Sequence, residues 1–233
     1  MARRLADDLA DHLRERILSG NIAPGERLAE AAIAEEYSVA RSTARIAVES
    51  LIADGLVERE ARKHPRVVTV DGSEIPEIVA LLEISESLAL ARIMAGHPDL
   101  RPLRAARGEQ PSRVLHTLVE VSGSKRLEAL HRPLTFHTML YAASRAEASS
   151  ADASRIGAAR AGAGRTNSSR ADASHIDSAL EQAQEQLIDA VLLGQESAWE
   201  ALRALQRARQ ARLGVDAGAV LSHAGGVTPQ KAR

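Results

Sequence analysis

The amino-acid sequence predicts a mainly α-helical protein, in which a small β-hairpin separates three N-terminal helices from a C-terminal all-α bundle. Three observations lead to this fold class. Apolar residues recur every three or four positions through most of the 233 residues, which is typical of helices with one buried face. Residues 56–60 and 66–70 instead alternate or run apolar, as short strands do. Aromatic residues make up only 2% of the chain, so the core must be aliphatic and rich in alanine, which favours closely packed helices.

Composition excludes several classes of protein. The chain has no cysteine, which excludes disulfides, thiolate metal sites and cysteine nucleophiles. The N-terminal sequence MARRLADD lacks the apolar stretch of a secretory signal, and no uncharged apolar run approaches the roughly 18 residues of a membrane helix. We therefore expect a cytoplasmic protein with no membrane partner. Because the net charge is −1, any binding of nucleic acid must depend on local basic patches.

The first seventy residues contain three predicted helices in close succession. Residues 5–18 carry leucine or isoleucine at every fourth position, which predicts an amphipathic helix. The segment NIAPG at 21–25 has the composition of a turn. Residues 29–37 form a short second helix, and the third lies within residues 37–56. Gly55 follows its last apolar turn, where a left-handed cap is expected.

The third helix has one apolar side and one basic side. Its buried stripe has apolar residues at three- and four-residue spacing, namely Ala44, Ala47, Val48, Leu51 and Ile52. Arg41, Ser42 and Arg45 lie toward the other side, and residues 37–47 contain no acid. A short helix that points guanidinium and hydroxyl groups away from a packed body is suited to the DNA major groove.

The predicted strands at 56–60 and 66–70 enclose a turn at Lys63-His64-Pro65. Three helices followed by a hairpin is the order of elements in a winged helix-turn-helix, with the third helix in the recognition position and the hairpin as the wing. We therefore expect residues 1–70 to form a DNA-binding domain and residues 71–76 to form a linker.

The motif PGERL at 24–28 and the motif VARSTAR at 39–45 lie in a segment, residues 9–70, that resembles the GntR family of transcriptional regulators. The resemblance implies that Arg41 and Arg45, with the small residues Ser42 and Thr43, contact operator bases and phosphates. It also implies that the wing reaches the minor groove, with His64 and Arg66 as its candidate DNA contacts.

Three residues depart from the pattern of the family. Ala40 stands where a serine usually begins the recognition helix, and losing a hydroxyl cap costs about 1 kcal/mol of helix stability. Ile46 replaces a usual glutamate. Pro65 stands where a wing-tip glycine is common, and a proline can neither donate an N–H to phosphate nor adopt a positive φ. These departures leave open the alternative of a helical ligand-binding or scaffold protein whose DNA binding has decayed.

Residues 77–214 are predicted to form a helical effector-binding and dimerisation domain. Helices are expected at 75–95, 114–121, 129–143, 178–193 and 197–213. The first of these should bury a wide face that includes Ile78, Leu81, Leu82, Leu88 and Ile93. Residues 146–175 are biased to Ala, Ser, Gly and Arg and have almost no large apolar residue, so they cannot supply a normal core helix. A loose segment, a rebuilt one and a loop over the pocket all stay open for this stretch. Residues 215–233 are expected to be a flexible tail.

This second half resembles the FadR branch of the same family through LLEISESLALA at 81–91, TFHTMLYAAS at 135–144 and LIDAVLLGQESAWEAL at 187–202. Many members of that branch hold a divalent metal with one Asp and three His. Here only His137 matches, because Pro133, Gln184 and Gln206 stand at the other positions. One imidazole and two amides are a poor set of ligands for a transition metal, so no metal or other cofactor is expected. His137, Gln184 and Gln206 remain candidates for the lining of an effector pocket.

The sequence therefore predicts a dimeric transcriptional regulator that binds double-stranded operator DNA and responds to a small-molecule effector. No catalytic residue is predicted, because the chain has no paired histidine and acid motif and no phosphate-binding glycine loop.

Overall fold

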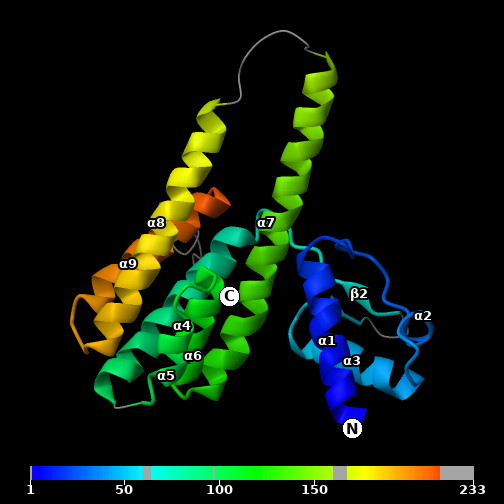
Figure 1. The fold of residues 1–233 in the computed structure, drawn as a ribbon, viewed down its shortest axis with the longest axis horizontal. Coiled ribbons are helices and arrows are strands. Elements are labelled where there is room, and N and C mark those ends of the chain that lie inside the picture. Colours follow the sequence, from blue (N-terminus) through cyan, green and yellow to red (C-terminus); the bar gives the residue numbers. More distant parts are fainter. Residues whose placement is uncertain (1, 60–63, 97, 160–166, 216–233) are drawn as a thin grey trace, which may run out of the picture. The chain divides into compact units, whose positions relative to one another are not determined.

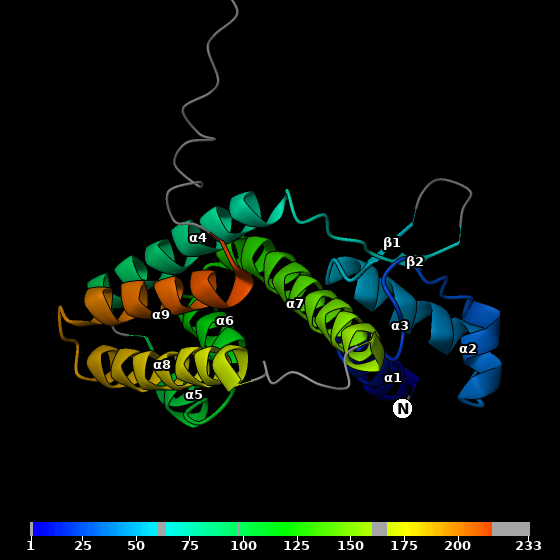
Figure 2. The ribbon, with the colours of Figure 1, turned by 90° about the horizontal axis from the view of Figure 1, so that it is seen from above.

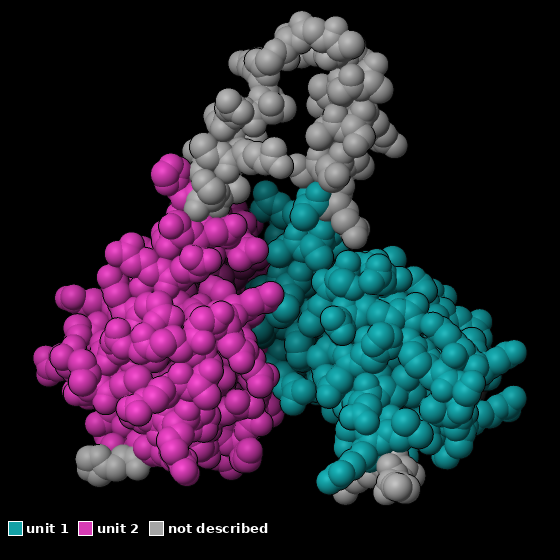
Figure 3. All heavy atoms as spheres, viewed as in Figure 1, with its two compact units in different colours: residues 1–72, 132–161 teal, residues 73–131, 162–233 magenta. Residues whose placement is uncertain are grey.

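The computed structural model describes residues 2–59, 64–96, 98–159 and 167–215, and only the backbone of residues 2, 3, 147–159 and 167–174. Figure 1 shows a mainly helical chain with one two-stranded sheet, which confirms the predicted fold class. The chain divides into two compact units (Figure 3). The first comprises Met1–Gly72 and Arg132–Ala161, and the second comprises Ser73–His131 and Gly162–Arg233.

The first unit begins with three helices around an aliphatic core. They are α1 (Ala2–Leu18), α2 (Glu30–Glu36) and α3 (Arg41–Ala53). The apolar stripe of α3 is buried as expected, except that Ile52 is only half-buried. Ser38 adopts a left-handed φ of 52° in the short link between α2 and α3, and Gly55 adopts φ 74° after α3. A left-handed residue at these two places ends one helix and turns the chain into the next element.

The hairpin of the first unit is formed by β1 (Val57–Glu58) and β2 (Arg66–Val67), which pair antiparallel. Residues 25–28 lie alongside β2. Arg27 forms a β-bridge with Arg66, and the Leu28 N–H donates to the Pro65 carbonyl at 2.8 Å. The hairpin occurs where the sequence predicts it. The predicted turn lies partly outside the described residues, which resume at His64.

Helix α7 (Lys125–Ala159) contributes residues 132–159 to the first unit, which differs from the single domain expected over 77–214. Leu140 is buried in the same cluster as the apolar stripe of α3, and Phe136 packs against that cluster. His137 Nε2 lies 2.9 Å from the Gly55 carbonyl oxygen. The spacing of apolar residues shows that a helix has a buried side, but it does not show which helices cover that side.

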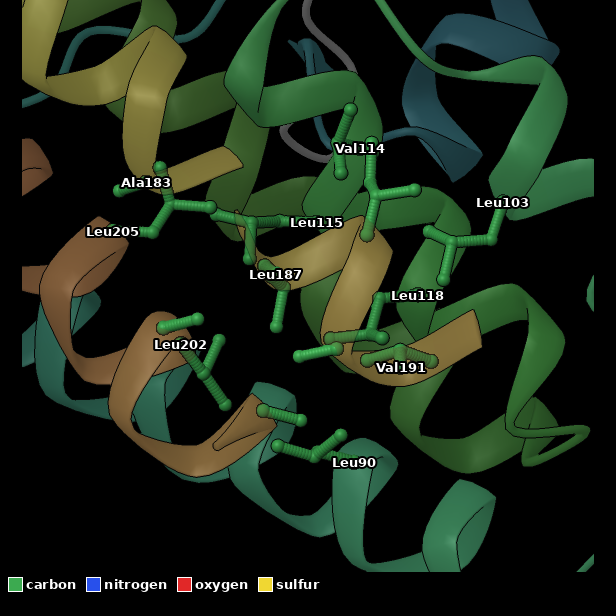
Figure 4. Close-up of a cluster of buried hydrophobic side chains, with 14 of the residues drawn as sticks. Leu90, Leu103, Val114, Leu115, Leu118, Ala183, Leu187, Val191, Leu202 and Leu205 are labelled. Carbon is green, nitrogen blue, oxygen red and sulfur yellow. The ribbon is translucent and has the colours of Figure 1, made fainter. Parts of the chain in front are cut away.

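The second unit is a helical bundle of α4 (Ile75–Ala95), α5 (Arg101–Ala105), α6 (Pro111–Val121), α8 (Asn167–Leu192) and α9 (Ala198–Leu213). Helix α9 contacts α4 and α8, while α6 contacts α4 and α8 from the other side (Figure 2). Figure 4 shows leucine, valine and alanine side chains from all five helices meeting in one core. None of the helices in the described ranges is both long enough and apolar enough to span a membrane.

Helix α4 has the predicted bounds, but its buried side differs from the expectation. Ile78, Leu82 and Ile93 are buried, whereas Leu88 is 51% exposed and Ile84 is 57% exposed. Ser85 and Glu86 take the inward positions between them. A helix with apolar residues on several sides can bury any one of them. The neighbouring helices therefore decide which side of α4 is buried.

Most of the Ala-, Ser- and Arg-rich stretch at 146–175 has a helical backbone. The backbone is helical up to Ala159 in α7 and again from Asn167 in α8, and residues 160–166 lie outside the described part. Alanine and arginine are strong helix formers, so a composition that lacks large apolar residues still supports helix. The predicted tail lies outside the description from residue 216 onward.

Candidate nucleic-acid interface

The outer side of α3 is basic and exposed. Arg41, Ser42 and Arg45 are all exposed on its first two turns. Neither arginine has a hydrogen bond or an ion pair with the residues that the structure describes. Ala40 precedes the helix and makes no side-chain cap bond, so the first N–H groups of α3 stay available to an acceptor.

Thr43 differs from the other predicted contacts of α3. Its side chain is 6% exposed, on the inner side beside Ala44 and Ala47. The family resemblance implies a DNA contact for Thr43 as well as for Ser42. However, a helix turns by about 100° per residue, so the Thr43 side chain points toward the core. A direct base contact by Thr43 does not fit this position.

One acid of α2 and one of α3 are paired with the same arginine. Arg59 Nη1 lies 2.9 Å from Glu49 of α3, and its Nη2 lies 2.6 Å from Glu30 of α2. One guanidinium between two carboxylates reduces the repulsion that they would exert on a DNA phosphate. The charge of Arg59 is therefore paired within the protein.

The wing presents His64 and Arg66, both exposed as the resemblance implies. Arg66 Nη1 donates to the Gly25 carbonyl at 3.0 Å, which fixes its guanidinium beside the turn that contains Gly25. Arg27, exposed and directly opposite Arg66, is a candidate DNA contact that sequence analysis missed. Two like charges opposite each other are unfavourable until an anion approaches them. Pro65 is buried, so it does not occupy the exposed surface of the wing.

The C-terminal end of α3 is held by two arginines. Asp54 is buried, and its carboxylate accepts hydrogen bonds from Arg14 Nε of α1 at 3.0 Å. Arg132 Nε of α7 lies 3.0 Å from the other carboxylate oxygen. The adjacent Gly55 is approached so closely by Pro133 that an added Cβ would lie 2.6 Å from the proline Cβ. These contacts fix the orientation of the recognition helix within the first unit.

The second unit contains a buried polar cluster around Glu86, which is 0% exposed. Its carboxylate lies 3.2 Å from His131 Nε2 and accepts hydrogen bonds from Gln206 Nε2 at 3.0 Å and Arg209 Nη2 at 3.1 Å. Burial alone would raise the pKa of Glu86, but Arg209 and His131 together hold that pKa at about 2. Sequence analysis missed this acid, although it falls on the buried stripe between Leu82 and Ala89.

The predicted effector residues are divided between the two units. His137 belongs to the first unit, where it contacts Gly55. In the second unit, Gln184 Nε2 donates to the Glu109 carbonyl at 2.8 Å and Gln206 donates to Glu86. Within the described residues, no three His, Cys, Asp or Glu side chains are placed to hold a metal ion. The pocket expected around His137, Gln184 and Gln206 stays a prediction, and the polar cluster that the second unit does contain is the one around Glu86.

Three helices followed by a hairpin, with the third helix basic and exposed, define a winged helix-turn-helix. The protein therefore combines a winged helix-turn-helix with a helical second unit. The model of the family described as "Bacterial regulatory proteins, gntR family" matches residues 5–67. The match covers the N-terminal domain, which is therefore similar to the DNA-binding domain of the GntR family of regulatory proteins.

Individual relatives agree with this assignment. The chain is 26% identical over 132 residues to the "Uncharacterized HTH-type transcriptional regulator YdhC" of Bacillus subtilis (strain 168). That match covers 56% of this chain and 56% of YdhC, so the chain spans about half the length of this relative.

Two solved structures share the fold. A GntR transcriptional regulator from Rhodococcus sp. RHA1 is 18% identical with a TM-score of 0.52, over 96% of this chain and 99% of that one. E. coli McbR/YncC is 14% identical with a TM-score of 0.52, over 95% and 99%. At these identities the likeness concerns the fold alone.

Proposed function

We propose that the protein is a dimeric transcriptional regulator. Its first unit binds double-stranded operator DNA, and its second unit binds a small-molecule effector that changes operator affinity. The observation that carries this proposal is the outer side of α3, where Arg41 and Arg45 are exposed with no partner among the described residues. An exposed, unpaired guanidinium is free to bind a phosphate or the major-groove edge of guanine.

The same observation favours DNA binding over a scaffold protein with decayed DNA binding. The departures at Ala40, Ile46 and Pro65 leave the helix and the hairpin in place. Pro65 is buried and its carbonyl accepts the Leu28 N–H, so this residue supports the wing. Asp54 is clamped by Arg14 and Arg132, which keeps the recognition helix in one orientation.

Pairing of two copies is supported by the outward side of α4. Ile84 and Leu88 are exposed four residues apart, and the half-buried Leu81 extends the same stripe by one turn. A second copy that buries this stripe would form a two-fold interface, because one patch would meet its own equivalent. Two recognition helices related by that axis would match a palindromic operator.

Effector binding is supported by unsatisfied polar atoms inside the second unit. Arg209 Nε and Gln184 Oε1 are buried without a hydrogen-bond partner in the described structure. Buried polar groups are normally hydrogen-bonded, so such atoms are places where a small polar molecule would gain contacts. A small molecule that engages them should raise the midpoint of thermal unfolding, and a tighter-binding molecule should raise it more at the same concentration.

The decisive experiment is a fluorescence-anisotropy titration of the full chain at low and moderate salt. One duplex carries the DNA upstream of the protein's own gene, and the other carries the same bases in shuffled order. We expect tighter binding to the upstream duplex and a loss of affinity with salt on both, because phosphate contacts release counterions. Equal and weak binding to the two duplexes would favour the scaffold alternative.

A further inference from the structure

Helix α3 carries one large apolar side chain on its otherwise polar outer side. Ile46 is 50% exposed, whereas Ala44, Ala47, Val48 and Leu51 on the inner side of the helix are fully buried. It lies one turn after Ser42 and next to Arg45, and both of these residues are exposed. Ile46 is therefore among the side chains that meet the DNA when α3 enters the major groove.

The packing of the first unit does not require an isoleucine at this position. Ile46 belongs neither to the buried cluster nor to the apolar residues that pack against it. A β-branched residue is also a weaker helix former than alanine or glutamate. Single exposed apolar side chains are common on protein surfaces, so exposure alone carries no conclusion. The position of Ile46 between exposed arginine and serine residues is the informative observation.

The charges around Ile46 suit contact with a base edge. Arg41 and Arg45 are exposed and have no ion pair among the described residues. Glu49, the next exposed residue along the same side, is paired with Arg59 at 2.9 Å. The surroundings of Ile46 are therefore basic enough to attract the DNA, while Ile46 itself offers a purely apolar contact.

We propose that Ile46 contacts the C5-methyl group of a thymine and gives the protein a preference for thymine at that operator position. Thymine is the base whose major-groove edge carries a methyl group, and apolar side chains recognise it by direct contact. This inference rests on the DNA binding by α3 proposed above, and it adds the kind of base that one residue reads.

The test compares duplexes that differ only in that methyl group. The full chain first selects binding sequences from a random-sequence duplex pool, and one selected sequence is then made with thymine or with deoxyuridine. Wild-type protein should bind the thymine duplex about fourfold more tightly for each methyl group contacted. Ile46→Ala should bind the two duplexes equally. Leu193→Ala, which truncates an exposed leucine of the second unit, should keep the wild-type ratio.

Each outcome separates the inference from the proposed function. Equal binding of the two duplexes by the wild type would overturn the role of Ile46 while leaving DNA binding intact. A thymine preference that persists in Ile46→Ala would assign the methyl group to another side chain. If no duplex is selected or bound, the inference and the proposed function both fail. Thermal unfolding of Ile46→Ala serves as a folding control, because truncating a half-exposed side chain outside the core leaves the fold intact.

Discussion

Arginines of the first unit differ in whether the protein itself pairs their charge. Arg14, Arg16 and Arg59 each contact a carboxylate, and they connect α1, α2, α3 and the hairpin. Arg41 and Arg45 have no such partner in the described structure. Exposed ion pairs contribute little to stability, but they do settle which guanidinium groups remain available to a phosphate or a base.

Substitution of Arg41 should separate DNA binding from folding. We expect Arg41→Ala to weaken operator binding by about 1–3 kcal/mol and to relax sequence preference, if the guanidinium reads a base. The free energy of unfolding should not change, since Arg41 is exposed and unpaired among the described residues. Fluorescence anisotropy with operator and shuffled duplexes measures the first effect, and urea unfolding measures the second. Arg101→Ala, an exposed arginine of the second unit, is the control. An equal loss on both duplexes would assign Arg41 to a phosphate.

Substitution of Glu86, unlike that of Arg41, should lower the free energy of unfolding. Glu86→Gln removes the carboxylate that faces Arg209, whose side chain is only 14% exposed. Leaving one member of a buried ion pair without its partner costs about 3–5 kcal/mol. Urea unfolding near neutral pH should show this loss. Asp99→Asn breaks the exposed pair with Arg101 and should change stability little. A loss for Glu86→Gln no larger than for Asp99→Asn would contradict a structural role for the buried pair.

The stability supplied by Glu86 should depend on pH in a defined direction. Its pKa is about 2 in the folded protein, below the ordinary value of 4.5, so folding favours the ionised carboxylate. A lowered pKa contributes stability that is complete above the unfolded pKa and is lost as pH falls toward the folded value. The difference in unfolding free energy between wild type and Glu86→Gln should therefore shrink from about pH 6 to about pH 3. A difference that stays constant over this range would contradict the assignment.

At the scale of the elements, the end of α3 shows how α7 belongs to the first unit. Gly55 has φ 74° and is approached by Pro133, while His137 contacts its carbonyl oxygen. A residue with a side chain at position 55 would meet both a left-handed backbone and a steric overlap. The glycine therefore serves two purposes, a helix cap and a close contact between α7 and the end of α3.

Two glycine substitutions can separate these effects. Gly55→Ala should cost about 1–2 kcal/mol for the left-handed backbone, and more for the overlap with Pro133. Gly108→Ala has a similar φ of 80°, but a Cβ there meets nothing within 4 Å, so it reports the backbone cost alone. Urea unfolding of the two variants gives the difference. Equal losses would show that Pro133 does not approach Gly55, and would separate residues 132–161 from the first unit.

At the scale of the whole molecule, the proposed regulator depends on two copies. We expect Ile84→Asp combined with Leu88→Asp to convert the dimer to a monomer, because a charge cannot be buried in the proposed apolar interface. Analytical ultracentrifugation measures the mass, and binding to a palindromic operator should weaken because only one recognition helix binds at a time. Leu193→Asp alters another exposed leucine and should leave the dimer unchanged. Persistence of the dimer in the double variant would place the interface elsewhere.

Local patterns made much of this fold predictable. The apolar spacing of α3, the expected cap at Gly55 and the bounds of α4 were all correct because they depend on neighbours within a few turns. The exposure of Arg41 and Arg45 follows from the same spacing, since residues opposite a buried stripe face outward. Composition left the state of residues 146–175 open, because a lack of large apolar residues removes a core face but does not prevent the alanine-rich backbone from being helical.

The sequence alone determined that this chain carries a winged helix-turn-helix with two outward arginines, because helix periodicity and turn chemistry are local. Only the tertiary structure decided which surfaces meet. It placed Leu140 in the core of the first unit with Phe136 packed against it, and it brought His137 into contact with Gly55. It also gathered Glu86, Gln206 and Arg209 into one buried cluster. The physical reason is that burial and ion pairing at these sites join residues tens of positions apart, and no local pattern encodes such partners.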